Sequence, residues 1–304
     1  MSISFIQVIP NLDIGNEYLI LKNGSIVFFE DDKMILYDLK TKNKKEYTLS
    51  TNSYDLRQII EFDDTTWVFT SICDYDVKIL KINEQEMKVN FQKLPIKFKE
   101  IVSDIIKLSN NRLGVFSNDG QFSIIDMKEK IIIHSLYFES SNMMTFFEFS
   151  NKELLLAISS DPDFIQIWNL KSYQCETYIM NNGLTGSIIE VVPINDKKVM
   201  LCTDRRIYIF DMSNKYTFER IFVLNKTELN KVIELRKGKY LLGCEDTYEI
   251  FDSKVRKILK LNKDKHWKAN CEAFYKINDK LLLIIFNDYS SFRGKTISLW
   301  KYTV

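Results

Sequence analysis

One pattern recurs along the whole chain and restricts its fold more than any other feature. It begins with two apolar residues, a variable residue, an apolar residue and a polar turn. A run of apolar residues follows, and then a stretch in which apolar and polar residues alternate. Residues 105–127, IIKLSNNRLGVFSNDGQFSIIDM, contain all three parts. The last apolar residue of the first part is an anchor, and the anchors are Leu21, Phe62, Leu108, Phe149, Ile194, Leu235 and Ile277. Their spacings of 41, 46, 41, 45, 41 and 42 residues indicate an array of similar structural units.

Each unit has the signals of short β-strands. Apolar residues alternate with polar ones or run for a few positions, and clusters of Asn, Asp and Gly between them favour turns. A fourth, less regular strand follows the third in six units, for example KIIIHSLYF at 130–138. Helical repeats would instead show a period of 3.6 residues. The sequence therefore predicts an all-β protein: a single seven-bladed β-propeller domain of four-stranded antiparallel blades over residues 1–304.

The two ends of the sequence suggest how the ring closes. After the third strand of the seventh unit, at 296–302, no residues remain for a fourth strand. Residues 3–9, ISFIQVI, have strand composition and precede the first unit. We expect them to supply the outer strand of blade seven and to pair with residues 296–302, which would cover two exposed sheet edges.

The ends of the third strands carry a family resemblance. IQIWNL contains Trp168 and Asn169, ISLWKY contains Trp300, and other third strands end at Asp38, Asp126, Asp211 and Asp252. These endings resemble the tryptophan-aspartate ending of the WD-repeat family. Asp31, Asp74, Asp119 and Asp204 are similar to that family's turn aspartate before the third strand. The resemblance implies a seven-bladed propeller. The family's Gly-His pair is missing, because the two histidines, His134 and His266, lie elsewhere, so we expect a divergent member held by strand pairing and apolar packing.

Charge and hydropathy limit the classes of partner. The 42 Lys and Arg residues balance 41 Asp and Glu residues, so no global field attracts the chain to nucleic acid or to an anionic membrane. The longest apolar runs, such as LLLIIF at 281–286, are shorter than the ~18 residues of a membrane span. Five cysteines without a C-x-x-C pair favour reduced thiols. We expect an intracellular protein, cytoplasmic or nuclear.

Catalytic signatures are not found in the sequence. G-x-S-x-G, P-loop, H-E-x-x-H and dinucleotide motifs are absent, so we expect no enzymatic activity, no cofactor and no metal. Glu61, Glu148 and Glu234 share the variable position of the first strand, where three carboxylates would suit a hard cation. Lys107 and Lys276 occupy the same position in other units and favour a charge-balanced channel mouth. A channel-site hydrolase or lyase based on the three glutamates is a remote alternative.

Two stretches near the end of the chain depart from the repeat. NDYSSFRGK at 287–295 lengthens the last unit, and KVRKILKLNKDKHWK at 254–268 is strongly basic. In the WD-like strand order both open on one face. The candidate partner-binding residues are His266, Trp267, Lys268, Tyr289, Phe292, Arg293 and Lys295. Aromatic side chains together with arginine are typical of protein-interface hot spots. A solvated loop with one aromatic packed back on the blade is the other interpretation.

A second candidate surface lies in the longest connection between units, KLPIKFKE at 93–100. Its residues are Lys93, Lys97, Phe98 and Lys99. Taken together, the sequence favours a non-enzymatic interaction scaffold or adaptor, a subunit of a larger complex that binds other proteins through its loops. The alternative is a propeller that binds RNA or a phosphoinositide through the basic stretch 254–268, with aromatic rings stacking on bases.

Overall fold

The computed structural model consists of β-strands joined by short turns. It describes residues 2–8, 18–21, 23–30, 33–49, 56–63, 66–71, 75–83, 85–138, 144–149, 152–160, 163–180, 184, 186, 188–213, 217–223, 228–244, 248–254, 257–260, 271–288 and 294–303. All regular elements within these residues are strands. Accordingly, the described part of the chain contains no helix of the length and hydropathy needed to cross a membrane. The chain divides into two compact units, one of Ile14–Asn182 and one of Met1–Asp13 with Gly183–Val304.

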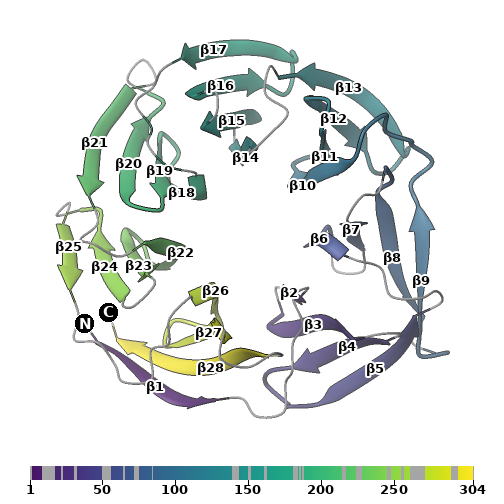
Figure 1. Cartoon of the computed structure of the whole chain (residues 1–304), viewed down its shortest axis with the longest axis horizontal. Helices are drawn as coiled ribbons and strands as arrows, with labels where there is room; N and C mark the ends of the chain where they lie inside the picture. Colours follow the sequence, from purple (N-terminus) through teal and green to yellow (C-terminus); the bar gives the residue numbers. More distant parts are fainter. Residues whose placement is uncertain are drawn as a thin grey trace. The chain divides into compact units, whose positions relative to one another are not determined.

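The unit Ile14–Asn182 contains four consecutive sets of four strands (Figure 1). The first set is β2 (Tyr18–Ile20), β3 (Ser25–Glu30), β4 (Lys33–Asp38) and β5 (Lys44–Leu49). The second is β6 (Leu56–Glu61), β7 (Trp67–Ser71), β8 (Lys78–Asn83) and β9 (Lys88–Lys93). The third is β10 (Val102–Leu108), β11 (Arg112–Ser117), β12 (Gln121–Asp126) and β13 (Ile131–Tyr137). The fourth is β14 (Met144–Phe149), β15 (Leu154–Ser160), β16 (Asp163–Asn169) and β17 (Gln174–Met180).

The other unit contains three four-stranded sheets. The first is β18 (Ile188–Asn195), β19 (Lys198–Thr203), β20 (Arg206–Asp211) and β21 (Thr217–Val223). The second is β22 (Leu229–Arg236), β23 (Lys239–Cys244), β24 (Tyr248–Asp252) and β25 (Lys257–Lys260). The third is β26 (Cys271–Lys276), β27 (Leu281–Asp288), β28 (Gly294–Thr303) and β1 (Ser2–Val8). Neighbouring strands within each set pair antiparallel and follow one another in the chain, except that β1 from the N-terminus pairs with β28 in the last set. The fold is all-β, as predicted, and its sheets are those of a β-propeller.

The N-terminal strand pairs with the last strand, which confirms the predicted partnership. Residue 2 lies opposite residue 303 and residue 8 opposite residue 298, with one irregularity between Phe5 and Gln7. Ile3 is buried in a core cluster with Trp300 and Tyr302 of β28. The N-terminal residues therefore supply both an outer strand and a core side chain to a sheet that is otherwise formed by the last strands of the chain.

Two sets of the unit Ile14–Asn182 are joined in a way that the repeat pattern does not predict. The outer strands β5 and β9 pair in parallel, with Thr48 opposite Lys88 and Leu49 opposite Val89. The amide of Thr48 donates a hydrogen bond of 3.0 Å to the carbonyl oxygen of Met87. This short ladder merges the two sets into one eight-stranded sheet.

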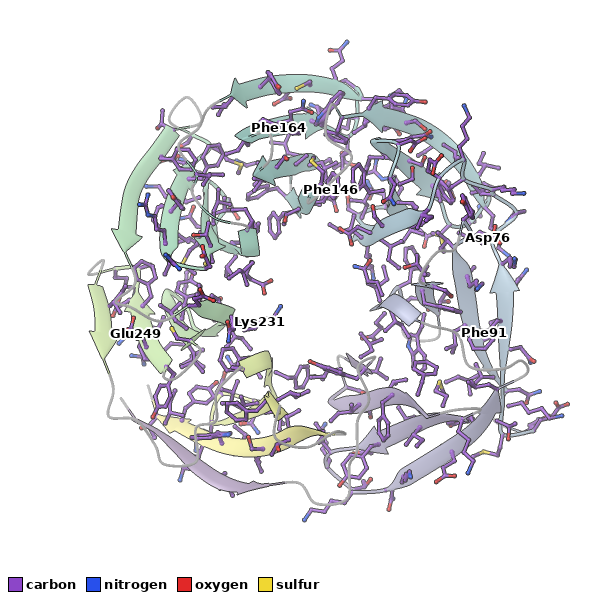
Figure 2. The ribbon with its side chains drawn as sticks, in the orientation of Figure 1. Asp76, Phe91, Phe146, Phe164, Lys231 and Glu249 are labelled. Atoms are coloured by element: carbon purple, nitrogen blue, oxygen red, sulfur yellow. The ribbon has the colours of Figure 1, made fainter. Side chains whose placement is uncertain are left out.

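Apolar packing between consecutive sheets forms the core. Five core clusters of the described residues each draw on two neighbouring sets of strands within one unit. Between the third and fourth sets, for example, the rings of Phe122 and Phe146 approach to 4.5 Å between centroids, and Phe164 belongs to the same cluster (Figure 2). Gly114 is needed here, because a Cβ atom on it would lie 2.3 Å from the Phe122 ring. Both faces of these sheets are covered, which explains why their middle strands are almost continuously apolar.

The pairing of β1 leads to a stability prediction. Ile3→Ala removes a buried side chain and should lower the free energy of unfolding by about 3 kcal/mol. Ile6→Ala on the same strand is the matched control, because Ile6 is exposed and its truncation should have little effect. Chemical denaturation of the two variants measures the difference. Equal stability of the two variants would contradict a structural role for β1.

Deletion of residues 1–9 should have a larger effect, because it uncovers the edge of β28 as well. We expect a lower melting temperature and more self-association, measured by light scattering. A monomeric truncated protein that melts within a degree or two of the full chain would show that β1 does not complete this sheet.

Candidate functional site

Most of the predicted loop surface lies outside the described residues. This is true of His266, Trp267, Lys268, Tyr289, Phe292 and Arg293, and of Lys295 only the backbone is described, at the start of β28. The described residues that flank these segments share one end of a sheet. Cys271, which follows the segment 261–270, pairs with Phe286, and Asp288 pairs with Gly294 across the segment 289–293. The topology thus brings the flanks of both segments to the same end of the sheet β26–β27–β28–β1.

The second predicted surface, residues 93–100, divides into buried and exposed side chains. Phe98 is 5% exposed and belongs to a core cluster with Met127, and its amide donates a hydrogen bond to the Tyr75 carbonyl oxygen at 3.2 Å. Lys97 and Lys99 on either side of it are exposed. The exposed side chains of this connection thus include Lys97 and Lys99, whereas Phe98 holds the connection on the sheets.

Lys93, the fourth residue predicted for this surface, ends β9. It forms an ion pair with Asp76, a residue that lies just before β8 (Figure 2).

Two of the three glutamates of the first strands, Glu148 and Glu234, make structural contacts. Glu148 accepts hydrogen bonds from both the amide and the hydroxyl of Ser109, each at 2.6 Å. Glu234 accepts one from the amide of Gly238 at 2.9 Å, in the turn that follows its own strand. Glu61 is half-buried at the end of β6. Nowhere in the described residues do three or more His, Cys, Asp or Glu side chains gather in a way that could hold a metal ion.

The lysines at the same repeat position also have partners of their own. Lys107 donates to the carbonyl oxygen of Phe62 and lies over the ring of that residue, 5.4 Å from its centroid. Lys276 forms an ion pair of 2.8 Å with Asp279, which raises the pKa of its ammonium group. Glu148, Glu234, Lys107 and Lys276 thus contact turns and neighbouring strands, and the charge-balanced channel mouth stays a prediction.

A buried arginine connects the third and fourth sets of strands, and sequence reasoning missed it. The guanidinium of Arg112 donates to the carbonyl oxygens of Ser109 and Leu170, both at 3.0 Å. It also lies 3.4 Å from Glu153 and 3.8 Å from Glu148. Glu148 and Glu153 belong to the fourth set, so this network fixes the turn after β10 against the neighbouring sheet.

Two other sheets have a lysine at the position that corresponds to Arg112. In the sheets β18–β21 and β22–β25 the first residue of the second strand is a lysine. It pairs with the aspartate that ends the third strand of its own sheet: Lys198 with Asp211 and Lys239 with Asp252. Arg112 has the equivalent place in β11, opposite Asp126, so its position was visible in the sequence but its partners were not.

The Arg112 network leads to a second stability prediction. Arg112→Met leaves the Glu148 carboxylate buried without its cation and should destabilise the protein by about 3 kcal/mol. The double variant Arg112→Met/Glu148→Met removes both charges and should recover part of the loss. Lys128→Met is the control, since Lys128 pairs with Glu129 on the exposed surface and should be neutral. Urea unfolding measures the stability of each variant. If Arg112→Met is as stable as the control, the network does not hold the sheets together.

The aspartates at the ends of third strands stabilise the turns that follow. Asp38 and Asp126 each accept two backbone hydrogen bonds, from residues two and three positions later. Asn169 does the same with its side-chain oxygen. In this chain the ending that resembles the WD-repeat family thus has a local function: it forms an Asx turn that directs the chain into the outer strand. The indole N–H of Trp300 donates a hydrogen bond of 2.7 Å to the hydroxyl of Ser298, within its own strand.

Among the aspartates at the ends of third strands, Asp211 has the pKa that is lowered most. The Ser213 hydroxyl at 2.7 Å, the Ser213 amide at 2.8 Å and Lys198 at 3.3 Å hold the pKa of Asp211 at about 2. This is below the ordinary value of a carboxyl group, so the folded state stabilises the ionised form. The stabilisation that the ionised Asp211 gives to the folded state is fully present above the pKa of this carboxyl group in the unfolded chain. It is lost as the pH falls from about 4 to about 2.

Asp211→Asn should therefore lower the stability at neutral pH, by about 1 kcal/mol. The difference between wild type and variant should shrink as the pH falls through the same window. Denaturation curves from pH 7 to pH 2 measure this difference, and Asp196→Asn, at an exposed turn residue, is the control. A difference that does not change with pH would contradict the assigned contacts of Asp211.

Comparisons with known proteins concern the fold. No family model matches the chain, and no curated protein matches it either. Among solved structures, the chain is similar to one in the crystal structure of a mitotic checkpoint complex, with 11% identity and a TM-score of 0.71 over 100% of this chain and 91% of that chain. This likeness and the four-stranded antiparallel sheets support a β-propeller fold.

Proposed function

We propose that the chain is a divergent WD-repeat protein whose seven blades form one closed propeller over residues 1–304. In this arrangement β1 completes the last blade and closes the ring, and the anchors from Leu21 to Ile277 mark successive inner strands. The pairing of β1 with β28 and the repeat spacing of 41 to 46 residues support it. The fold likeness over the full length of the chain agrees with it.

We further propose that this propeller is a non-enzymatic interaction scaffold, a subunit of a larger intracellular assembly. The observation that carries the proposal is the use of the charged residues of the inner strands. Glu148, Glu234, Lys107 and Lys276 all contact turns or neighbouring strands. Side chains that a channel site would need are therefore used to hold the frame together, and a rigid frame presents its loops for binding. One solved structure with a similar fold is that of a mitotic checkpoint complex, which agrees with this role.

The partner-binding surface of this proposal combines residues 266–268 with residues 289–295. The flanks of both segments depart from the same end of one sheet. Three aromatic residues, Trp267, Tyr289 and Phe292, and three basic ones, Lys268, Arg293 and Lys295, would then offer the composition of an interface hot spot.

The test has two stages. Affinity purification with mass spectrometry of the tagged chain identifies a co-purifying protein, and that protein is then purified for binding measurements. Trp267→Ala and Phe292→Ala should each weaken its binding by about 2 kcal/mol, roughly 30-fold in Kd. The melting temperature should hardly change. Tyr178→Ala is the control, because Tyr178 is an exposed aromatic residue on β17.

Other results would redirect the proposal. If purified RNA or phosphoinositide vesicles bind instead, with an affinity that falls steeply with salt and depends on Lys263, Lys265, Lys268 and Arg293, the surface recognises phosphate and not protein. If none of these substitutions changes any interaction, the loops 266–268 and 289–295 are solvated and the proposed surface is wrong.

A further inference from the structure

The three sheets of the unit that contains β18 to β28 have an excess of basic residues at one end. In each of these antiparallel sheets, the turn between the first and second strands and the turn after the third strand lie at the same end, which we call the turn end. In the sheet β18–β21, for example, Lys198 lies opposite both Asn195 and Asp211. The sheets β22–β25 and β26–β27–β28–β1 have the same antiparallel order.

Contacts of two tyrosines show that the turn ends of these three sheets adjoin. The hydroxyl of Tyr240, near the start of β23, donates to the carbonyl oxygen of Pro193, near the end of β18, at 3.5 Å. The hydroxyl of Tyr302, near the end of β28, donates to the carbonyl oxygens of Leu235 and Asn278 at 3.3 and 2.9 Å. All five residues lie within a few positions of a turn, so the three turn ends form one continuous surface.

Most of the acidic side chains on this surface already have partners within their own sheets. Glu234 is half-buried and accepts a hydrogen bond from the amide of Gly238. Asp196 is exposed. The other three pair with lysines: Asp211 with Lys198, Asp252 with Lys239 and Asp279 with Lys276.

Further basic residues of the turn ends are exposed, and they give the surface its excess charge. They are Lys197, Arg236, Lys237, Lys254, Lys280 and Lys301. The described side chains of the turn ends thus include nine basic and five acidic residues. The stretches 214–216 and 255–257, whose side chains lie outside the described residues, contain no acidic residue. We call the six exposed residues the basic turn surface.

Residues of the basic turn surface that come from different turns lie near one another. The amide that follows Lys301 donates to the carbonyl oxygen of Lys280 at 2.9 Å. A Cβ atom on Gly238, the residue after Lys237, would lie 3.6 Å from the Cγ atom of Lys254. Lysines held close together by the backbone repel one another, and an anion bound between them would relieve this repulsion.

The charge of the whole chain restricts the size of that anion. The chain has 42 basic and 41 acidic residues, so an excess of four basic residues at the turn ends leaves the remainder of the chain net negative. A long nucleic acid or the plane of an anionic membrane would extend beyond the basic turn surface and meet this negative remainder. A short acidic segment would contact the basic turn surface alone.

The side chains of these turns also disfavour two other modes of binding. None of the large apolar side chains that are exposed in the described residues belongs to these turns. The described turns therefore offer no exposed aromatic ring for stacking on bases and no apolar anchor for a lipid bilayer. Recognition by this surface depends on charge, and lysine ammonium groups act as point charges on flexible stems.

We propose that the basic turn surface binds a short segment of a partner protein that is rich in Asp and Glu. Its carboxylates pair with Lys237, Lys254, Lys280 and Lys301. In the last sheet this surface lies at the end opposite to the one from which the segments 261–270 and 289–293 depart. The proposal rests on the proposed function in treating the protein as an interaction module, and it gives the module a second binding surface.

Binding measurements with the purified full chain test the proposal with three labelled probes. These are a short peptide in which Asp and Glu alternate with Ser, a short DNA duplex, and vesicles that contain phosphatidylserine. The peptide should bind, and more weakly as the salt concentration rises. Lys237→Glu/Lys280→Glu should weaken its binding by about tenfold, because two attractive charges become repulsive. Asp196→Lys should strengthen the binding, a gain that damage to the fold would not produce.

A matched control separates this surface from the overall charge of the chain. Lys81→Glu/Lys88→Glu, at exposed positions of β8 and β9 in the other unit, changes the net charge by the same amount and should bind the peptide normally. Equal weakening by both double variants would overturn the proposal, as would a peptide that does not bind. If the duplex or the vesicles bind more tightly than the peptide through Lys237 and Lys280, the surface recognises phosphate and the proposal is wrong.

The loop surface at 266–268 and 289–295 is tested separately. Trp267→Ala and Phe292→Ala should leave the affinity for the acidic peptide unchanged. Lys237→Glu/Lys280→Glu should in turn leave binding of a partner through those loops unchanged. Failure of the basic turn surface is therefore distinguishable from failure of the proposed function.

Discussion

Packing of one sheet against the next is the interaction on which the rest of this structure depends. A four-stranded sheet that is apolar on both faces is not stable alone in water, because each face needs an apolar cover. The core clusters described above each join two consecutive sets of strands within a unit, such as Phe122 of β12 with Phe146 of β14. The apolar content of the repeat follows from this requirement. The same requirement explains why the fold does not need the polar motifs that are missing from this chain, because burial of apolar surface between sheets holds the sheets together.

Polar contacts between sheets determine how neighbouring sheets are oriented. Gln58 exchanges two hydrogen bonds with the backbone of Ile105, and the Tyr302 hydroxyl donates to the carbonyl oxygens of Leu235 and Asn278. Lys231 pairs with Glu190 at 2.8 Å across two neighbouring sheets (Figure 2). These contacts differ from one pair of sheets to the next. Apolar packing is repeated in each unit, whereas the polar links that orient neighbouring sheets are particular to each pair.

Much of the fold could be predicted from the sequence, because it depends on short-range patterns. Alternation, turn residues and the anchor spacing identify the strands, and the unpartnered segment 3–9 identifies the strand that pairs with β28. The partners of Arg112 could not be predicted, because the distance from a β11 side chain to Leu170 or Glu153 depends on how two sheets pack. The parallel pairing of β5 and β9 could not be predicted either, because the outer strands have the weakest sequence patterns. Phe98 shows the same limit for the candidate site: between two lysines it resembles a surface residue, yet tertiary packing buries it.

The partnership of β1 with β28 also affects the order in which the protein can fold. Residues 2 and 303, which lie opposite each other, are at opposite ends of the chain. During synthesis β1 is made before β28, and it has to remain without its native partner until β28 has been made. The last sheet therefore forms through the contact of greatest sequence separation, whose loop-closure entropy slows its formation. Folding of the earlier sheets can proceed from local hairpins, but completion of this sheet has to wait for the synthesis of β28.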